Sequence, residues 1–153
     1  MATVLVPVDF DGCCERVLDV AARLARDLGA ELVLLHVLPL AVFPFPEFPP
    51  PLVTKMGEEA SRDSREALER LAARVGGTAM LREGDPSTGI LHAIEQLDPR
   101  MVVMGTHSRA SMKRIVLGSV AKDVSRRSPV PVVIVSNAGV APVAGATAKA
   151  SNG

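Results

Sequence analysis

Short runs of β-branched and aliphatic residues alternate with longer amphipathic segments along most of this chain. The apolar runs cover residues 3–8, 31–37, 78–81, 101–104 and 130–135. Between these runs, apolar residues keep helical spacing over residues 14–28, 54–75, 87–97 and 118–127. Such an alternation predicts a parallel sheet with helices on both of its faces. We therefore predict a single doubly wound α/β domain, with five parallel strands in the order 3-2-1-4-5.

The composition is that of an ordinary globular domain. Its 153 residues are 48% apolar but only 3% aromatic, so they supply one core of aliphatic side chains. Seventeen basic residues balance seventeen acidic ones, which provides no general attraction to nucleic acid or anionic membranes. No apolar run is long enough to cross a bilayer, and no signal peptide is evident. We expect a cytoplasmic protein whose domain covers residues 1–136, followed by a disordered tail over residues 137–153.

A proline-rich segment, residues 39–51, follows the second predicted strand. Six of its thirteen residues are proline, which excludes a helix or a central strand and favours an extended loop. It also holds three of the four phenylalanines of the chain, Phe43, Phe45 and Phe48. A solvated linker has no need of these side chains, so we expect the loop to pack on something. A fold-back onto its own domain, a lid over a pocket and a partner-binding arm all agree with this composition.

The loop after the fourth predicted strand carries the main sign of chemistry. Gly105 ends that strand, and a glycine there lets backbone N–H groups approach an anion closely. Gly118 and Ser119 open the next helix, whose first N–H groups are unpaired and whose dipole favours negative charge. From Pro99 to Lys122 there is no acidic residue, and the basic residues are Arg100, Arg109, Lys113, Arg114 and Lys122. The loop therefore favours an anionic ligand, such as a phosphate group.

A second loop is expected at the same edge of the sheet. The carboxyl ends of parallel strands share one edge, and ligands bind where the strand order reverses. If the first strand lies beside the fourth, Asp9 and Gly105 line opposite sides of one crevice. The loop after the first strand, which carries Asp9, and the loop after the fourth strand, which begins at Gly105, would then meet.

Known catalytic patterns fit the chain poorly. It contains no Walker A sequence, no G-x-G-x-x-G and no G-x-S-x-G. The turn Asp9-Phe10-Asp11-Gly12, with Thr106 and Lys113 or Lys122, imitates a haloacid-dehalogenase-type phosphatase. The final acidic pair of such a phosphatase is missing, and a magnesium phosphotransferase needs carboxylates gathered on its metal. A receiver domain is excluded as well, because Ser136 and Asn137 stand where its lysine would be.

Cysteine and histidine add no further site. Cys13 and Cys14 are adjacent, so ordinary disulfide geometry is closed to them, and two neighbouring thiols make a poor metal site. The histidines, His36, His92 and His107, lack the spacing of a zinc site. We predict no catalytic residue and no metal ligand among the side chains, and at most slow turnover.

Several segments, taken together, resemble the universal stress protein family. They are Val4-Leu5-Val6-Pro7-Val8-Asp9, Leu34-Leu35-His36-Val37, Val103-Met104-Gly105-Thr106-His107, Leu117-Gly118-Ser119-Val120 and Pro129-Val130-Pro131-Val132-Val133-Ile134-Val135. The likeness runs in order from about residue 3 to residue 135. The nucleotide-binding branch of that family carries the motif G-x2-G-x9-G-[ST]. This chain keeps the spacing from Gly105 to Gly118-Ser119 but has Ser108 at the second glycine.

The resemblance implies an adenine-nucleotide site. Its ligand would be ATP, or ADP or AMP, with Mg²⁺ or Mn²⁺ bound through the phosphates. The residues implied at the site are Pro7, Val8, Asp9, Val37, Met104, Gly105, Thr106, His107, Ser108, Arg109, Gly118, Ser119 and Val120. Ser108 would be strained by about 1 kcal/mol or more if its position needs a positive φ. Its hydroxyl would alternatively supply one more hydrogen-bond donor to a phosphate.

The resemblance also implies a role and an assembly. The role is that of an ATP-binding regulatory protein of the stress response; the alternative is a dimeric module of this family that binds no nucleotide and acts through protein contacts. The homodimer would pair the last strands, residues 130–135, of two copies. Pro129 and Pro131 are typical of such an edge strand. A monomer whose edge is covered by the tail is the competing interpretation.

Overall fold

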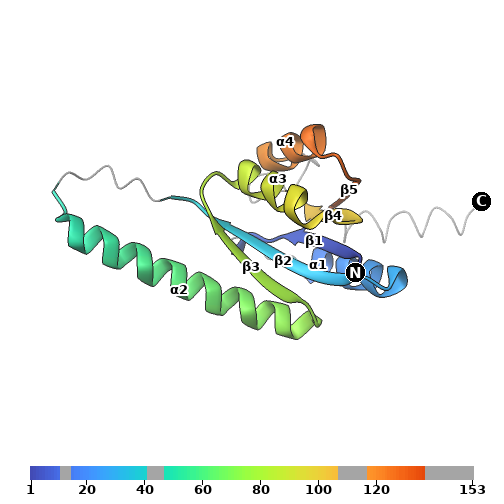
Figure 1. Cartoon of the computed structure of the whole chain (residues 1–153), viewed down its shortest axis with the longest axis horizontal. Helices are drawn as coiled ribbons and strands as arrows, with labels where there is room; N and C mark the ends of the chain where they lie inside the picture. The colour runs from blue at the N-terminus through green and yellow to red at the C-terminus, as the bar shows by residue number, and fades with distance from the viewer. Residues whose placement is uncertain (11–14, 41–46, 107–116, 137–153) are drawn as a thin grey trace, which may run out of the picture.

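The computed structural model describes residues 1–10, 15–40, 47–106 and 117–136 (Figure 1). In chain order, its elements are β1 (Thr3–Pro7), α1 (Glu15–Leu28), β2 (Glu31–Leu38), α2 (Pro50–Val75), β3 (Thr78–Glu83), α3 (Pro86–Leu97), β4 (Met101–Gly105), α4 (Ser119–Arg127) and β5 (Val132–Val135). The strands form one parallel sheet in the order β3-β2-β1-β4-β5. The predicted fold class and strand order are therefore confirmed.

Alternation along the strands divides the core into two layers. Val4 and Val6 of β1 pack on one face with the buried residues of α1 and α2, whereas Leu5 packs on the other face with α3 and α4. All three side chains are fully buried. Such continuous burial on both faces is what aliphatic strands of a parallel sheet provide. The core is thus a three-layer sandwich with a pair of helices on each side.

The start of α2 corrects the prediction for the proline-rich segment. The helix begins at Pro50 rather than at residue 54, so Pro50 and Pro51 belong to its first turn and not to a loop. Proline is tolerated there because its missing N–H is one that a helix leaves unpaired. Residues 41–46, which include Phe43 and Phe45, lie outside the described part of the chain. The helix ends as predicted, at Gly76 in the left-handed region with a φ of 73°.

Other boundaries shift by a few residues. β1 ends at Pro7 instead of Val8, β3 continues to Glu83, and β5 begins at Val132, so Val130 lies before the strand. Gly118 is the N-cap of α4, and Ser119 is the first residue of the helix. Cys13, Cys14 and the predicted tail fall outside the described residues. None of the helices described here has the length and apolarity needed to cross a membrane.

Candidate functional site

The central strand β1 stops earlier than its neighbour β2. Pro7 is level with Leu35, while β2 continues for three more residues to Leu38. The last described hydrogen bond between the two strands runs from the Val8 N–H to the Leu35 carbonyl, at 2.8 Å. The ladder of β1 therefore ends at Pro7, and the region beyond it lies between the carboxyl ends of β2 and β4. We refer to this region as the β1 notch.

Pro7 itself weakens the other side of β1. In a parallel ladder, successive residues direct their backbone groups to opposite neighbours. Val8 donates toward β2, so Pro7 faces β4, and it has no N–H to donate. The described pairing of β1 with β4 consists of Val4 with Met101 and Leu5 with Val102, and stops before Pro7. The described pairing of β1 with β4 thus ends before this proline, at the point where the strand order reverses.

Val37 turns its backbone into the β1 notch from the side of β2. Its neighbour Leu38 accepts a hydrogen bond from Gly84, next to β3, so the N–H and carbonyl of Val37 point the other way, toward the side of β1. Its side chain is only 7% exposed and packs against α3. Val37 therefore offers a ligand one backbone donor and one backbone acceptor, but not its isopropyl group.

Gly105 directs its backbone N–H and carbonyl toward the β1 notch from the side of β4. Thr106 donates to the Val135 carbonyl of β5 at 3.1 Å, so the backbone groups of Gly105 face β1 and the notch. The Thr106 side chain is buried, and that of Met104 lies within the core beneath α3 and α4. Both residues support the strand end and leave the glycine backbone as the group that faces the notch.

The first turn of α4 lies at the same edge of the sheet, because the helix runs back against the parallel strands that flank it. Gly118 caps the helix with an extended backbone, and among the described residues no side-chain capping hydrogen bond is made there. Leu117 and Val120 pack on the core and fix this end, while Ser119 is exposed. No acidic residue lies in the first turn. These features make the end of α4 suitable for an anion.

The loop after β1 is held by a histidine that sequence reasoning left aside. Nδ1 of His36 lies 2.8 Å from the Val8 carbonyl oxygen, and the ring lies 4.5 Å from that of Phe10. Asp9, between these two anchored residues, is exposed at the edge of the notch. Only the pairing of β1 with β2 brings His36 to this loop, which is why spacing in the sequence did not reveal the contact.

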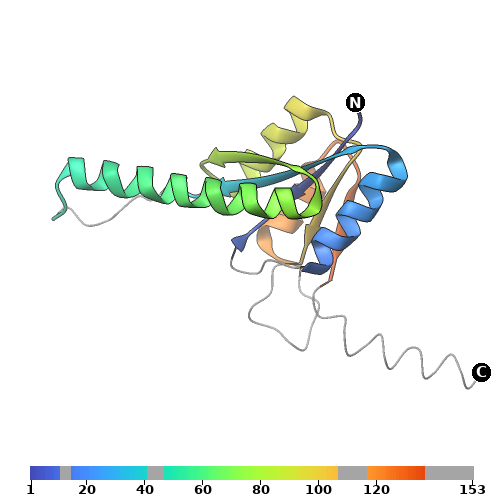
Figure 2. The ribbon, with the colours of Figure 1, turned by 90° about the horizontal axis from the view of Figure 1, so that it is seen from below.

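The predicted site residues are thus collected from four elements. Pro7, Val8, Asp9, Val37 and Gly105 lie at or just beyond the carboxyl ends of β1, β2 and β4, and α4 begins at the same edge of the sheet. Figure 2 shows the ribbon of these elements from below. His107, Ser108 and Arg109 lie outside the described residues. Within the described ranges, no group of three or more His, Cys, Asp or Glu side chains is arranged to hold a metal ion.

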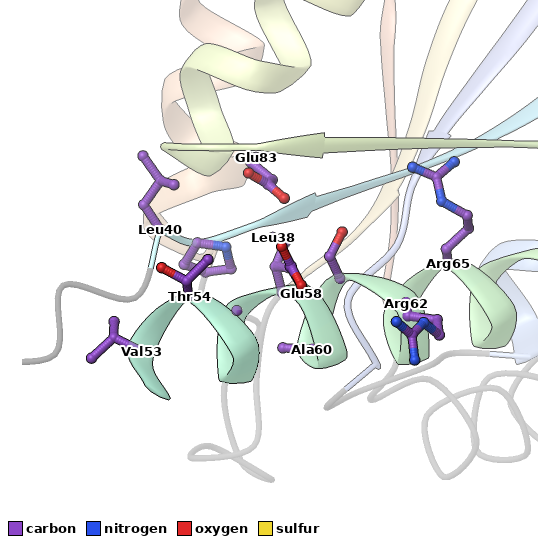
Figure 3. A pocket seen from close by; sticks show the side chains of 12 residues that line it. Leu38, Leu40, Val53, Thr54, Glu58, Ala60, Arg62, Arg65 and Glu83 are labelled. Atoms are coloured by element: carbon purple, nitrogen blue, oxygen red, sulfur yellow. The ribbon is translucent and has the colours of Figure 1, made fainter. Parts of the chain in front are cut away.

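A hollow of about 620 Å³ lies between the first half of α2 and the ends of β2 and β3 (Figure 3). Its walls carry apolar groups from Leu38, Leu40 and Val53 together with charged side chains of both signs. None of the residues predicted for the nucleotide site lines it. The hollow therefore offers no support for that site.

Comparisons with known proteins place these features in a family. The model of the universal stress protein family matches residues 1–136. Universal stress protein YxiE of Bacillus subtilis is 28% identical over 142 residues, which cover 86% of this chain and 96% of that protein. The solved structure of MJ0577, a universal stress protein of Methanocaldococcus jannaschii, is 28% identical with a TM-score of 0.68, and the match covers 89% and 96% of the two chains. The structure of the universal stress protein of Archaeoglobus fulgidus in complex with dAMP has a TM-score of 0.57 at 23% identity, covering 88% and 97%.

Proposed function

We propose that this chain, which belongs to the universal stress protein family, binds an adenine nucleotide at the β1 notch and acts as a regulatory protein of the stress response in the cytoplasm. ATP is the nucleotide we propose first, with ADP and AMP as alternatives. One observation carries the proposal: Val37 and Gly105, on either side of the shortened strand β1, both turn backbone groups toward the same notch.

The base would be read by Val37. Adenine presents an acceptor at N1 and a donor at N6 on adjacent positions, and a residue with a free N–H and carbonyl on one side complements that pair. Because the Val37 side chain is held against α3, the direction of these backbone groups is fixed before a ligand arrives. Asp9, exposed at the edge of the loop after β1, is the residue we assign to the ribose hydroxyls.

The phosphates would lie toward Gly105 and the start of α4. Uncapped N–H groups at a helix start, together with the helix dipole, bind phosphate without any charged side chain. Met104, Thr106 and Val120 support this region, and we assign the remaining phosphate contacts to residues 107–109 and to the Ser119 hydroxyl. Mg²⁺ or Mn²⁺ would be bound through the phosphates, because the described side chains include no carboxylate cluster that could hold it alone.

The Archaeoglobus fulgidus relative supports the ligand class only indirectly. At 23% identity it shows the shared fold, and its reported ligand, dAMP, is an adenine nucleotide. We bring that class to this chain because its own backbone geometry offers the complementary groups. A nucleotide-free module that acts through protein contacts is the second candidate.

Thermal unfolding with magnesium-ATP separates these two candidates. A ligand that binds the native state raises Tm, by an amount equivalent to about 2.7 kcal/mol at 100 times Kd. We expect a rise with ATP and none with an equal concentration of inorganic sulfate and magnesium. No rise at millimolar ATP, and no nucleotide retained through purification, would contradict the proposal.

Substitution at the helix start locates the site. Gly118→Val places a branched side chain where the phosphates would approach, so we expect ATP binding to be lost while the fold is retained. Gly57→Val, on the exposed part of α2 where the structure leaves open space, is the matched control and should bind ATP normally. Equal ATP affinity in both variants would place the ligand elsewhere.

Ser108 sets the affinity in this proposal. Ser108→Gly restores the glycine of the family motif and should bind ATP as tightly as the unaltered chain, or more tightly. Calorimetric titration measures the difference. A clear loss of affinity would mean that the Ser108 hydroxyl is itself a phosphate ligand.

A further inference from the structure

We propose that His36 is a positioning residue that joins the base side of the notch to its ribose side. The inference rests on the proposed nucleotide site and adds a residue to it that touches no ligand. His36 directly precedes Val37 on β2, yet its side chain reaches the loop after β1. One residue thus connects the strand assigned to adenine with the loop assigned to ribose.

The hydrogen bond defines the state of the ring. The Val8 carbonyl can only accept, so Nδ1 of His36 carries the proton and donates it across 2.8 Å. The Val8 N–H already donates to Leu35 at 2.8 Å. Both backbone groups of Val8 are therefore tied to β2, and the loop leaves the sheet from a fixed point.

The ring contact holds the other end of the loop. Phe10 is 37% exposed, and its ring meets the His36 ring at a centroid distance of 4.5 Å and an angle of 48°. Tilted aromatic contacts of this kind are favourable beyond their buried area. Asp9 lies between Val8 and Phe10, so both of its neighbours are anchored by the same imidazole. His36 thus constrains the backbone on both sides of Asp9.

Because successive side chains of β2 alternate between the two faces of the sheet, this strand can both hold the loop after β1 and present Val37 to the base. The side chains of His36 and Val37 emerge on opposite faces of the sheet, with Val37 packed toward α3. His36 therefore acts on the nucleoside half of the site and has no contact with the start of α4. Replacement of His36 should therefore lower the affinity for AMP and the affinity for ATP by the same factor.

Two variants separate the donor from the ring. His36→Phe keeps an aromatic ring beside Phe10 but removes the Nδ1–H donor, whereas His36→Asn places an amide N–H near the position of Nδ1. We expect His36→Phe to lower the affinity for AMP and for magnesium-ATP about three- to tenfold. This is the change in affinity that the loss of one net hydrogen bond produces. His36→Asn should recover most of that loss. His92→Asn, at an exposed position on α3, is the matched control and should leave both affinities unchanged.

Calorimetric titration of the four proteins with each nucleotide gives distinct outcomes. Equal affinities in the unaltered chain and His36→Phe would overturn the inference and leave the proposed function intact. A loss that falls on ATP but not on AMP would also overturn it, because the effect would then lie on the phosphates. If the unaltered chain binds neither nucleotide, the proposed function fails and the inference with it. If His36→Phe loses affinity and His36→Asn does not recover it, the effect comes from general disruption of the sheet, and the inference is overturned.

Discussion

At the level of single residues, the site depends on how closely α3 can approach β2. Gly89 of α3 is buried against Val37, and a β-carbon at Gly89 would lie 2.8 Å from both γ-carbons of that valine. Real β-carbons do not come so close to other atoms, and valine is stiff at χ1. The absence of a side chain at Gly89 therefore sets the position of Val37, whose backbone faces the notch.

Gly89→Ala should destabilise the protein and weaken nucleotide binding together. We expect a loss of about 1–3 kcal/mol in the free energy of unfolding, the usual effect of overpacking, measured by chemical denaturation. Gly57→Ala, on α2 with open space around it, should instead stabilise by about 0.5–1 kcal/mol because alanine favours a helix. Equal stabilities for Gly89→Ala and the unaltered chain would show that α3 and Val37 adjust freely.

Asp85 provides a pH prediction at the same scale. Hydrogen bonds from the Thr88 backbone N–H, at 2.9 Å, and from its hydroxyl, at 3.0 Å, hold the pKa of this N-cap carboxyl below its ordinary value. A carboxyl with a lowered pKa in the folded state stabilises that state above its unfolded pKa, and the contribution is lost as the pH falls through the folded pKa.

Asp85→Asn should therefore reduce the acid sensitivity of the fold. Asparagine can still accept the Thr88 N–H, but it does not titrate. We expect the free energy of unfolding to fall less in this variant than in the unaltered chain between about pH 5 and pH 2. Urea unfolding at a series of pH values measures the two slopes. Parallel slopes would contradict the prediction.

Among the elements, α2 is divided into two unlike halves. Its buried residues, Leu68 and Ala72, lie in the last third and cover β2 and β3. The first half extends beyond the sheet, and Leu52 and Met56 on it are each 40% exposed (Figures 1 and 2). Isolated helical segments of this length are marginal in water. The helical structure of the first half of α2 therefore depends on its continuation into the half that packs on the sheet.

Matched leucine substitutions test this division. Leu68→Ala removes a side chain with no exposed surface and should cost about 2–5 kcal/mol in the free energy of unfolding. Leu52→Ala, the same change in the exposed half, should stay within about 0.5 kcal/mol of the unaltered chain. A similar cost for both would mean that a partner or a second copy covers the first half of α2 in solution.

At the scale of the whole molecule, the edge strand β5 is the surface through which we propose that two copies pair. β5 is an edge strand, and the carbonyls of Pro131 and Val135 accept hydrogen bonds from the N–H groups of Val102 and Thr106. By alternation, Val132 and Ile134 turn their backbone groups away from the sheet. A second copy could pair with these outward groups, which is the assembly we propose, through Val132–Val135 rather than the longer segment that the sequence indicated.

Two substitutions at Ile134 distinguish backbone pairing from side-chain packing. Both Ile134→Ala and Ile134→Pro remove the same aliphatic contact with the core, but only proline removes the outward N–H. Sedimentation velocity should therefore find Ile134→Ala dimeric and Ile134→Pro monomeric. A monomer for the unaltered chain, or a dimer for the proline variant, would contradict pairing through this edge.

The sequence by itself determined the architecture. Periodicity is a local property, so the alternation of apolar runs and helical segments identified each helix and strand of the described residues. Parallel connectivity then placed the loops after β1 and β4 at one edge. The boundary of α2 was wrong because a proline count does not distinguish a loop from a first helical turn. The prediction that Gly105 and Gly118 bind a phosphate came from the chemistry of single residues.

Only the tertiary structure decided which groups face the notch. The direction of the Val37 and Gly105 backbones depends on register and on where β1 ends, and neither is encoded in any one segment. The contact of His36 with Val8 joins residues 28 positions apart through the pairing of two strands. Sequence reasoning treated His36 as a strand residue without a role because hydrogen bonds are directional, and direction exists only once the sheet has formed.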